Sequence, residues 1–67
     1  MILVSYRIYT PKEDDEDGEL ILVYTGTELI EVFELEKFED EKLEEFGQNQ
    51  NISTEYLWLE ITMYVHI

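Results

Sequence analysis

Alternation of apolar and polar residues marks the first part of the chain as a β-hairpin. Residues 2–9 carry an apolar residue at every second position, and one face of this strand collects Ile2, Val4, Tyr6 and Ile8. Residues 20–25 form a second, shorter apolar run. The charged loop between them contains Asp17-Gly18, a dipeptide typical of tight turns. We therefore expect two antiparallel strands.

The last segment, residues 56–67, shows the most regular alternation. One face is aliphatic and consists of Leu57, Leu59, Ile61, Met63, Val65 and Ile67. The opposite face consists of Tyr56, Trp58, Glu60, Thr62, Tyr64 and His66. Because a shift of one residue would expose all six aliphatic side chains, the pattern predicts a strand with a firmly specified register.

The segment between the hairpin and the last strand carries apolar residues near helical spacing. The pattern predicts a helix over residues 28–46, with Gly47 as its stop, followed by a polar loop. The spacing is clean only from Leu35 onward. Residues 28–35 also fit a strand that pairs back on the preceding one. We favour the helix from about residue 28 and keep the strand as the alternative.

These elements predict one α+β domain over residues 1–67. Its order is β-β-α-β, with a three-stranded, mainly antiparallel sheet packed on one amphipathic acidic helix. The second face of the sheet then presents aromatic side chains, and a contiguous aromatic patch usually marks an interface. A core this small supplies only about 3–5 kcal/mol. We therefore expect a homodimer whose interface includes Tyr56, Trp58 and Tyr64, with a heterologous partner or cover by another part of the chain as the alternatives.

The net charge narrows the possible functions. The 67 residues include 17 acidic and 4 basic side chains, which gives a formal charge of −13. Such a chain is repelled by nucleic acid and by anionic membranes, so we expect neither as a direct partner. Apolar residues still make up 45% of the chain, which predicts folding rather than disorder. No apolar run approaches a membrane span, and no basic flank or apolar core suggests a secretion signal. We expect a cytoplasmic protein.

Catalytic and metal-binding motifs are weak in this sequence. It has no cysteine, one histidine (His66) and three scattered glycines, so no nucleophilic triad or phosphate loop is expected. An EF-hand alignment with Gly18 at the sixth position puts Tyr24 at the twelfth, where a bidentate carboxylate is required. We expect no enzymatic activity, no cofactor and no metal site.

The acidic middle of the chain suggests a different role. Nine of the 18 residues from Glu28 to Glu45 are acidic, about one carboxylate per 3 Å of helix axis, and one DNA strand presents a phosphate about every 3.4 Å. Such a surface can occupy a DNA-binding groove. The residues expected to imitate phosphates are Glu28, Glu31, Glu34, Glu39, Glu41, Glu44 and Glu45. An apolar anchor is also needed, and any aromatic of this region left at the rim could supply it. The residues expected to act as the anchor are Phe38, Leu43 and Phe46.

The arrangement resembles the small acidic uracil-DNA glycosylase inhibitors of lytic Bacillus phages. The matching pieces are Asp14-Asp15-Glu16-Asp17-Gly18, the strand with Tyr24, the helix end Leu43–Phe46, Gly47-Gln48-Asn49 and Glu60-Ile61-Thr62-Met63. Members of that family form dimers, block the DNA-binding groove of the enzyme and enclose its protruding leucine with an aromatic residue.

The resemblance implies that Leu43 or Phe46 takes the enclosing role, with Phe38 nearby. It implies that Glu39, Glu41, Glu44 and Glu45 replace phosphates. The helix region of this chain is longer and more acidic than in the family. Two alternatives remain open. One is mimicry directed at a restriction enzyme, a CRISPR effector or a nucleoid protein. The other is a small dimeric assembly module whose acidity serves only solubility.

Overall fold

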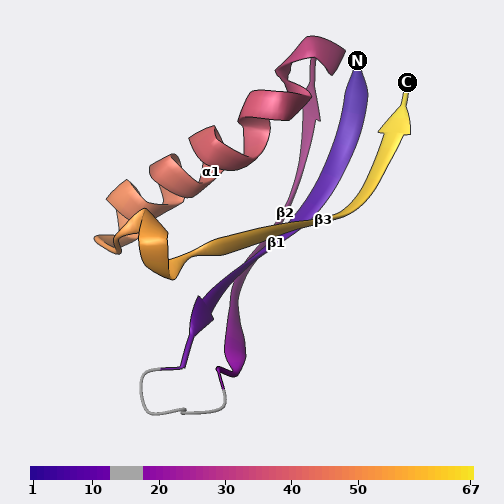
Figure 1. The fold of residues 1–67 in the computed structure, drawn as a ribbon. Coiled ribbons are helices and arrows are strands. Elements are labelled where there is room, and N and C mark those ends of the chain that lie inside the picture. The colour runs from indigo at the N-terminus through magenta and orange to yellow at the C-terminus, as the bar shows by residue number, and fades with distance from the viewer. Residues whose placement is uncertain (13–17) are drawn as a thin grey trace.

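The computed structural model describes residues 1–12 and 18–67, and these residues form the expected small α+β fold (Figure 1). Three antiparallel strands make one sheet in the order β2-β1-β3, and helix α1 lies across one of its faces. The elements are β1 (Ile2–Pro11), β2 (Leu20–Ile30), the 3₁₀ turn η1 (Val32–Glu34), α1 (Leu35–Gln50), the 3₁₀ turn η2 (Thr54–Tyr56) and β3 (Trp58–His66).

The core lies between the centre of the sheet and α1. The predicted apolar face of β1 is confirmed, since Ile2, Val4, Tyr6 and Ile8 are all buried. Phe38 of α1 packs its ring edge-on against Tyr6, with ring centroids 5.3 Å apart. The remaining buried core residues are Leu57 and Leu59. Burial of each such side chain stabilises the fold by about 1.5–3 kcal/mol.

The start of the helix was predicted wrongly. The segment from residue 28 to Ile30 belongs to β2, and α1 begins only at Leu35. Pairing explains the difference, because the last residues of β2 lie opposite the start of β1, with Ile30 opposite Ile2. Gly26 permits this pairing at its centre, since a Cβ there would clash with the ring and hydroxyl of Tyr6. The long-range ladder therefore prevails over local helical spacing.

The end of the helix was also predicted wrongly. Gly47 does not stop α1, which continues to Gln50 and ends at Asn51 in the left-handed conformation, with φ of 57°. Gly47 is instead buried where the chain folds back over the helix. A Cβ at this position would lie 2.6 Å from the backbone oxygen of Ile52, whose amide donates a hydrogen bond to the Gly47 carbonyl at 2.8 Å. This glycine permits close backbone approach.

A bulge in β3 changes which side chains share a face. Ile61 lies opposite Tyr6 and Met63 opposite Ser5, so Thr62 is an extra residue. Such a residue reverses the alternation beyond it. Leu59 and Ile61 face the helix as predicted. Met63 and Val65 lie on the opposite face, whereas Tyr64 pairs with Val4 on the helix side. The predicted common faces of residues 56–67 are therefore wrong beyond Ile61.

The hairpin between β1 and β2 is closed by a hydrogen bond from the Lys12 amide to the Glu19 carbonyl at 3.0 Å. Gly18 has φ of 74°, in the left-handed region that favours glycine. The acidic loop residues 13–17, which fill the first five positions of the EF-hand alignment, lie outside the described residues. Among the residues described, no helix has the length and apolar character needed to cross a membrane.

Candidate functional site

The acidic residues of α1 form the main charged surface of the described chain. The helix carries six of them, all exposed: Glu36, Glu39, Asp40, Glu41, Glu44 and Glu45. From the first to the last the axis rises about 14 Å, which is about one carboxylate per 2.7 Å. That density lies between about 3.4 Å per phosphate for one DNA strand and about 1.7 Å for the duplex.

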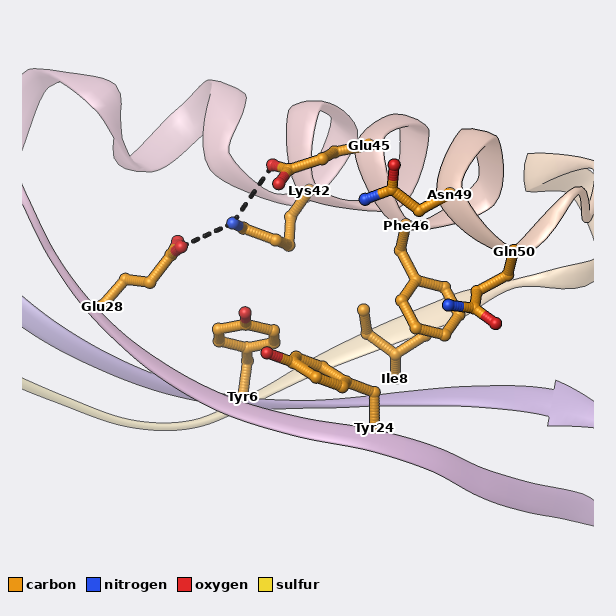
Figure 2. A pocket seen from close by; sticks show the side chains of 9 residues that line it. All are labelled: Tyr6, Ile8, Tyr24, Glu28, Lys42, Glu45, Phe46, Asn49 and Gln50. Atoms are coloured by element: carbon orange, nitrogen blue, oxygen red, sulfur yellow. Dashed lines mark hydrogen bonds and ion pairs between the residues drawn. The ribbon is translucent and has the colours of Figure 1, made fainter.

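Two of the predicted phosphate mimics instead hold a lysine. The Nζ of Lys42 lies 2.6 Å from a carboxylate oxygen of Glu28 and 3.3 Å from one of Glu45, and these contacts connect α1 to β2 (Figure 2). The side chain of Lys42 is only 14% exposed and lies about 6 Å from the rings of Tyr6 and Phe38. Glu28 and Glu45 therefore carry less free charge than their neighbours.

The other predicted phosphate mimics are exposed and uncompensated. Within the part of the chain that the structure describes, no basic side chain lies within ion-pair distance of Glu39, Glu41 or Glu44. The same holds for Glu31 and Glu34, which lie beside and within η1, just before α1. These carboxylates are available to a basic partner.

The predicted apolar anchors are placed differently from one another. Phe38 is 5% exposed and lies in the core, so its prediction as a surface anchor is wrong. Leu43 and Phe46 are half-buried and pack against the core from α1. Phe33, in η1, is 78% exposed; it is an aromatic residue of this region left at the rim, although it was not chosen among the expected anchors. The adjacency of Val32 and Phe33 was the available signal, because two neighbouring residues rarely both face one core.

The predicted aromatic interface is not a single face. Trp58 pairs with Tyr9 on the side of the sheet away from α1, and Tyr64 lies on the helix side because of the bulge. Tyr56, in η2, lines a hollow together with Thr10 and Ile21. Each of the three predicted aromatics is more than half exposed. Only Trp58 remains a candidate for an interface on the sheet face away from α1.

A hollow of about 220 Å³ lies between α1 and β2, and Figure 2 shows the side chains that line it. Tyr6 and Tyr24 rise from the sheet toward Lys42 and Phe46 of the helix. Burial raises the pKa of Tyr6 to about 12, and the Lys42 charge only partly opposes it. Burial lowers the pKa of Lys42, but the hydrogen bond to Glu28 and the neighbouring charges outweigh it and raise the pKa. At neutral pH both groups stay protonated, so neither is poised as a base or nucleophile.

In residues 1–12 and 18–67, no three histidine, aspartate or glutamate side chains lie close enough together to hold a metal ion. Comparisons of the chain with protein-family models, with curated proteins and with solved structures give no match. The candidate site is therefore interpreted from its own charges and exposed side chains.

Proposed function

We propose that this protein is a DNA mimic that inhibits a DNA-binding enzyme by occupying its DNA-binding groove, with uracil-DNA glycosylase as the first target to test. The observation that carries this proposal is the row of exposed carboxylates along α1, in which only Glu45 has an ion-pair partner among the described residues. The protein binds its target without chemistry and needs no cofactor. It acts in the cytoplasm, where such enzymes meet DNA.

The spacing of the carboxylates supports the choice of a DNA groove over a generic basic surface. Asp40 and Glu44 lie one helical turn apart, about 6 Å along the axis, and Glu41 lies beside them on the exposed side of α1. Together the six acidic residues of α1 place about one carboxylate per 2.7 Å of axis, close to the value of about 3.4 Å per phosphate in one DNA strand. Complementary charge of this kind gives fast association that weakens as salt is added.

The exposed aromatic ring of Phe33 supports a docked complex rather than a loose electrostatic one. It lies at the start of the acidic run, between Glu31 and Glu34, and half-exposed Val32 adjoins it. Buried aromatic contacts contribute strongly to binding, whereas rim charges mainly direct the encounter. Enzymes that flip bases insert side chains into DNA, and an apolar wedge of this kind offers Phe33 a contact.

The test is a uracil-excision assay. Purified bacterial uracil-DNA glycosylase is titrated with the protein at about 150 mM salt, and the same titration is repeated with excess DNA. We expect complete inhibition at a fixed protein-to-enzyme ratio, relieved by DNA through competition. Full activity in the presence of excess protein would reject the glycosylase as the target. A pull-down from cell lysate with mass spectrometry would then identify another DNA-binding protein.

A further inference from the structure

The sheet face that points away from α1, here called the outer face, has an ordered pattern of side chains. The strand register arranges it in four rows of three residues, one from each strand. In order along β1, from the hairpin end, the rows are Leu22–Tyr9–Trp58, Thr25–Arg7–Glu60, Thr27–Ser5–Met63 and Leu29–Leu3–Val65. The two end rows are apolar throughout, and the two middle rows are mainly polar.

No described element covers these rows. Helix α1 and both 3₁₀ turns lie on the other side of the sheet (Figure 1). The end rows are correspondingly open, with Trp58 62% and Leu29 51% exposed. The described chain therefore leaves large apolar side chains on this face exposed to water.

The outer face also differs from the rest of the protein in charge. Of the acidic residues that the structure describes, only Glu60 stands in these rows, and Arg7 lies 4.0 Å from it. The outer face is thus close to neutral, although the chain carries a formal charge of −13. Two copies of such a chain repel one another through α1 but not through this face.

We propose that the outer face is covered by the outer face of a second copy of this chain. The order of the rows supports this occupant: apolar, polar, polar, apolar reads the same in both directions. A two-fold axis that crosses the strands between the middle rows brings each apolar end row onto the other and leaves the polar rows facing polar rows. Self-complementarity under a two-fold axis is the requirement for an isologous dimer.

The area of the outer face limits the stability of the proposed dimer. Four rows and three strands cover about 20 by 10 Å between Cα positions, or about 400 Å² with side-chain margins. Two such faces fall below the 1,200–2,000 Å² or so of stable interfaces. We therefore expect a weak dimer that dissociates on dilution.

This arrangement has a consequence that rests on the proposed function. With the outer faces together, the two α1 helices lie on opposite surfaces of the dimer. Each copy then binds its own target enzyme, and inhibition follows one chain per enzyme. A monomeric protein would show the same ratio, so the oligomeric state is tested separately and without any target.

The test measures mass by sedimentation between about 1 and 200 µM, together with the emission of Trp58, the only tryptophan. We expect a monomer–dimer equilibrium, with emission that shifts to longer wavelength on dilution. Trp58→Ser and Val65→Ser, one in each apolar end row, should each weaken the dimer about tenfold or more. The matched control is Tyr64→Ser, because the exposure of Tyr64 lies between those of Trp58 and Val65 on the same strand, but its side chain lies on the helix side.

Three results would overturn the proposal. The first is a monomer mass over the whole range. The second is a dimer that both end-row variants leave intact, which would indicate pairing through a free strand edge. The third is equal weakening by the Tyr64 control. Circular dichroism of every variant establishes that the monomer is folded, so a loss of dimer cannot be confused with unfolding.

Discussion

The two faces of the sheet differ in burial and in charge, although the same three strands form both. The helix-side face buries Val4, Ile8 and Phe38 and makes the fold, while its helix turns a dense row of carboxylates to solvent. The outer face keeps apolar end rows exposed and carries almost no charge. Charge repels copies and attracts a basic target, and a neutral apolar face does the reverse. Under the two proposals above, one face binds a basic partner and the other binds a second copy of the chain.

The largest loss of stability should come from a substitution in the core, between α1 and the helix-side face of the sheet. Phe38→Ala removes the ring that packs on Tyr6, and loss of a buried phenylalanine costs about 3–5 kcal/mol. That is close to the whole stability of a domain this small. We expect the variant to be largely unfolded by circular dichroism. Phe33→Ala is the matched control and should keep the wild-type melting temperature, because Phe33 is exposed. An equal loss of stability in both variants would contradict the placement of Phe38 in the core and of Phe33 at the surface.

The next effect should come from the ion pairs beneath the acidic surface. Lys42→Met removes the cation between Glu28 and Glu45 and leaves a half-buried carboxylate without a partner. We expect a loss of about 1–2 kcal/mol in urea unfolding. Lys37→Met, on the exposed side of the same helix, should change stability by less than about 0.5 kcal/mol. A Lys42 variant as stable as wild type would show that the pairs only neutralise charge.

Alkaline pH should weaken the contact between Lys42 of α1 and the sheet residues Tyr6 and Glu28. The folded pKa of Tyr6 is about 12, above its ordinary value of 10.0, and the pKa of Lys42 is raised above 10.5. Raised folded values mean that the stabilisation is complete below the ordinary pKa and disappears as pH rises through the folded pKa. We expect stability to fall between pH 10 and about 12, followed by circular dichroism. Tyr6→Phe should shift this loss, and an unchanged profile in that variant would exclude Tyr6 as its source.

The smallest loss of stability should come from removal of the bulge residue in β3. Deletion of Thr62 leaves Ile61 opposite Tyr6 and Met63 opposite Ser5, and removes only the hydrogen bond from the Thr62 hydroxyl to the Ser5 carbonyl. We expect a folded protein that loses less than about 1 kcal/mol. If the unbroken alternation of the sequence governed the strand instead, the deletion would exchange its faces, and the melting temperature would fall by many degrees.

The sequence predicted correctly those strands and helices in which the spacing of apolar residues matches the side chains that are buried. β1 alternates without interruption, and every second residue from Ile2 to Ile8 is buried as predicted. The β-β-α-β order followed from the same patterns. The start of α1 was not predictable in this way, because residues 28–30 carry helical spacing and become a strand only by pairing with β1. A register bulge likewise leaves no local mark, so the reversal after Ile61 was missed.

The sequence predicted the acidic surface of the candidate site correctly, but not which apolar side chain is exposed beside it. The exposed carboxylates of α1 follow from any helix over this acidic segment. The core position of Phe38 and the exposure of Phe33 depend on where the helix begins, since a start near residue 28 would rotate other residues toward the sheet. Lys42 was visible as a basic residue among acids, but its placement over Tyr6 required the fold.

The most direct test of the account is the salt dependence of binding to uracil-DNA glycosylase. The dissociation constant is measured from about 50 to 300 mM salt for the wild type, for Glu41→Gln with Glu44→Gln, and for Glu55→Gln, in η2, as a control outside α1. We predict that the wild type weakens steeply with salt, that the double variant binds less tightly with a flatter slope, and that the control matches wild type. A double variant with unchanged affinity and slope would contradict the role of the helix carboxylates.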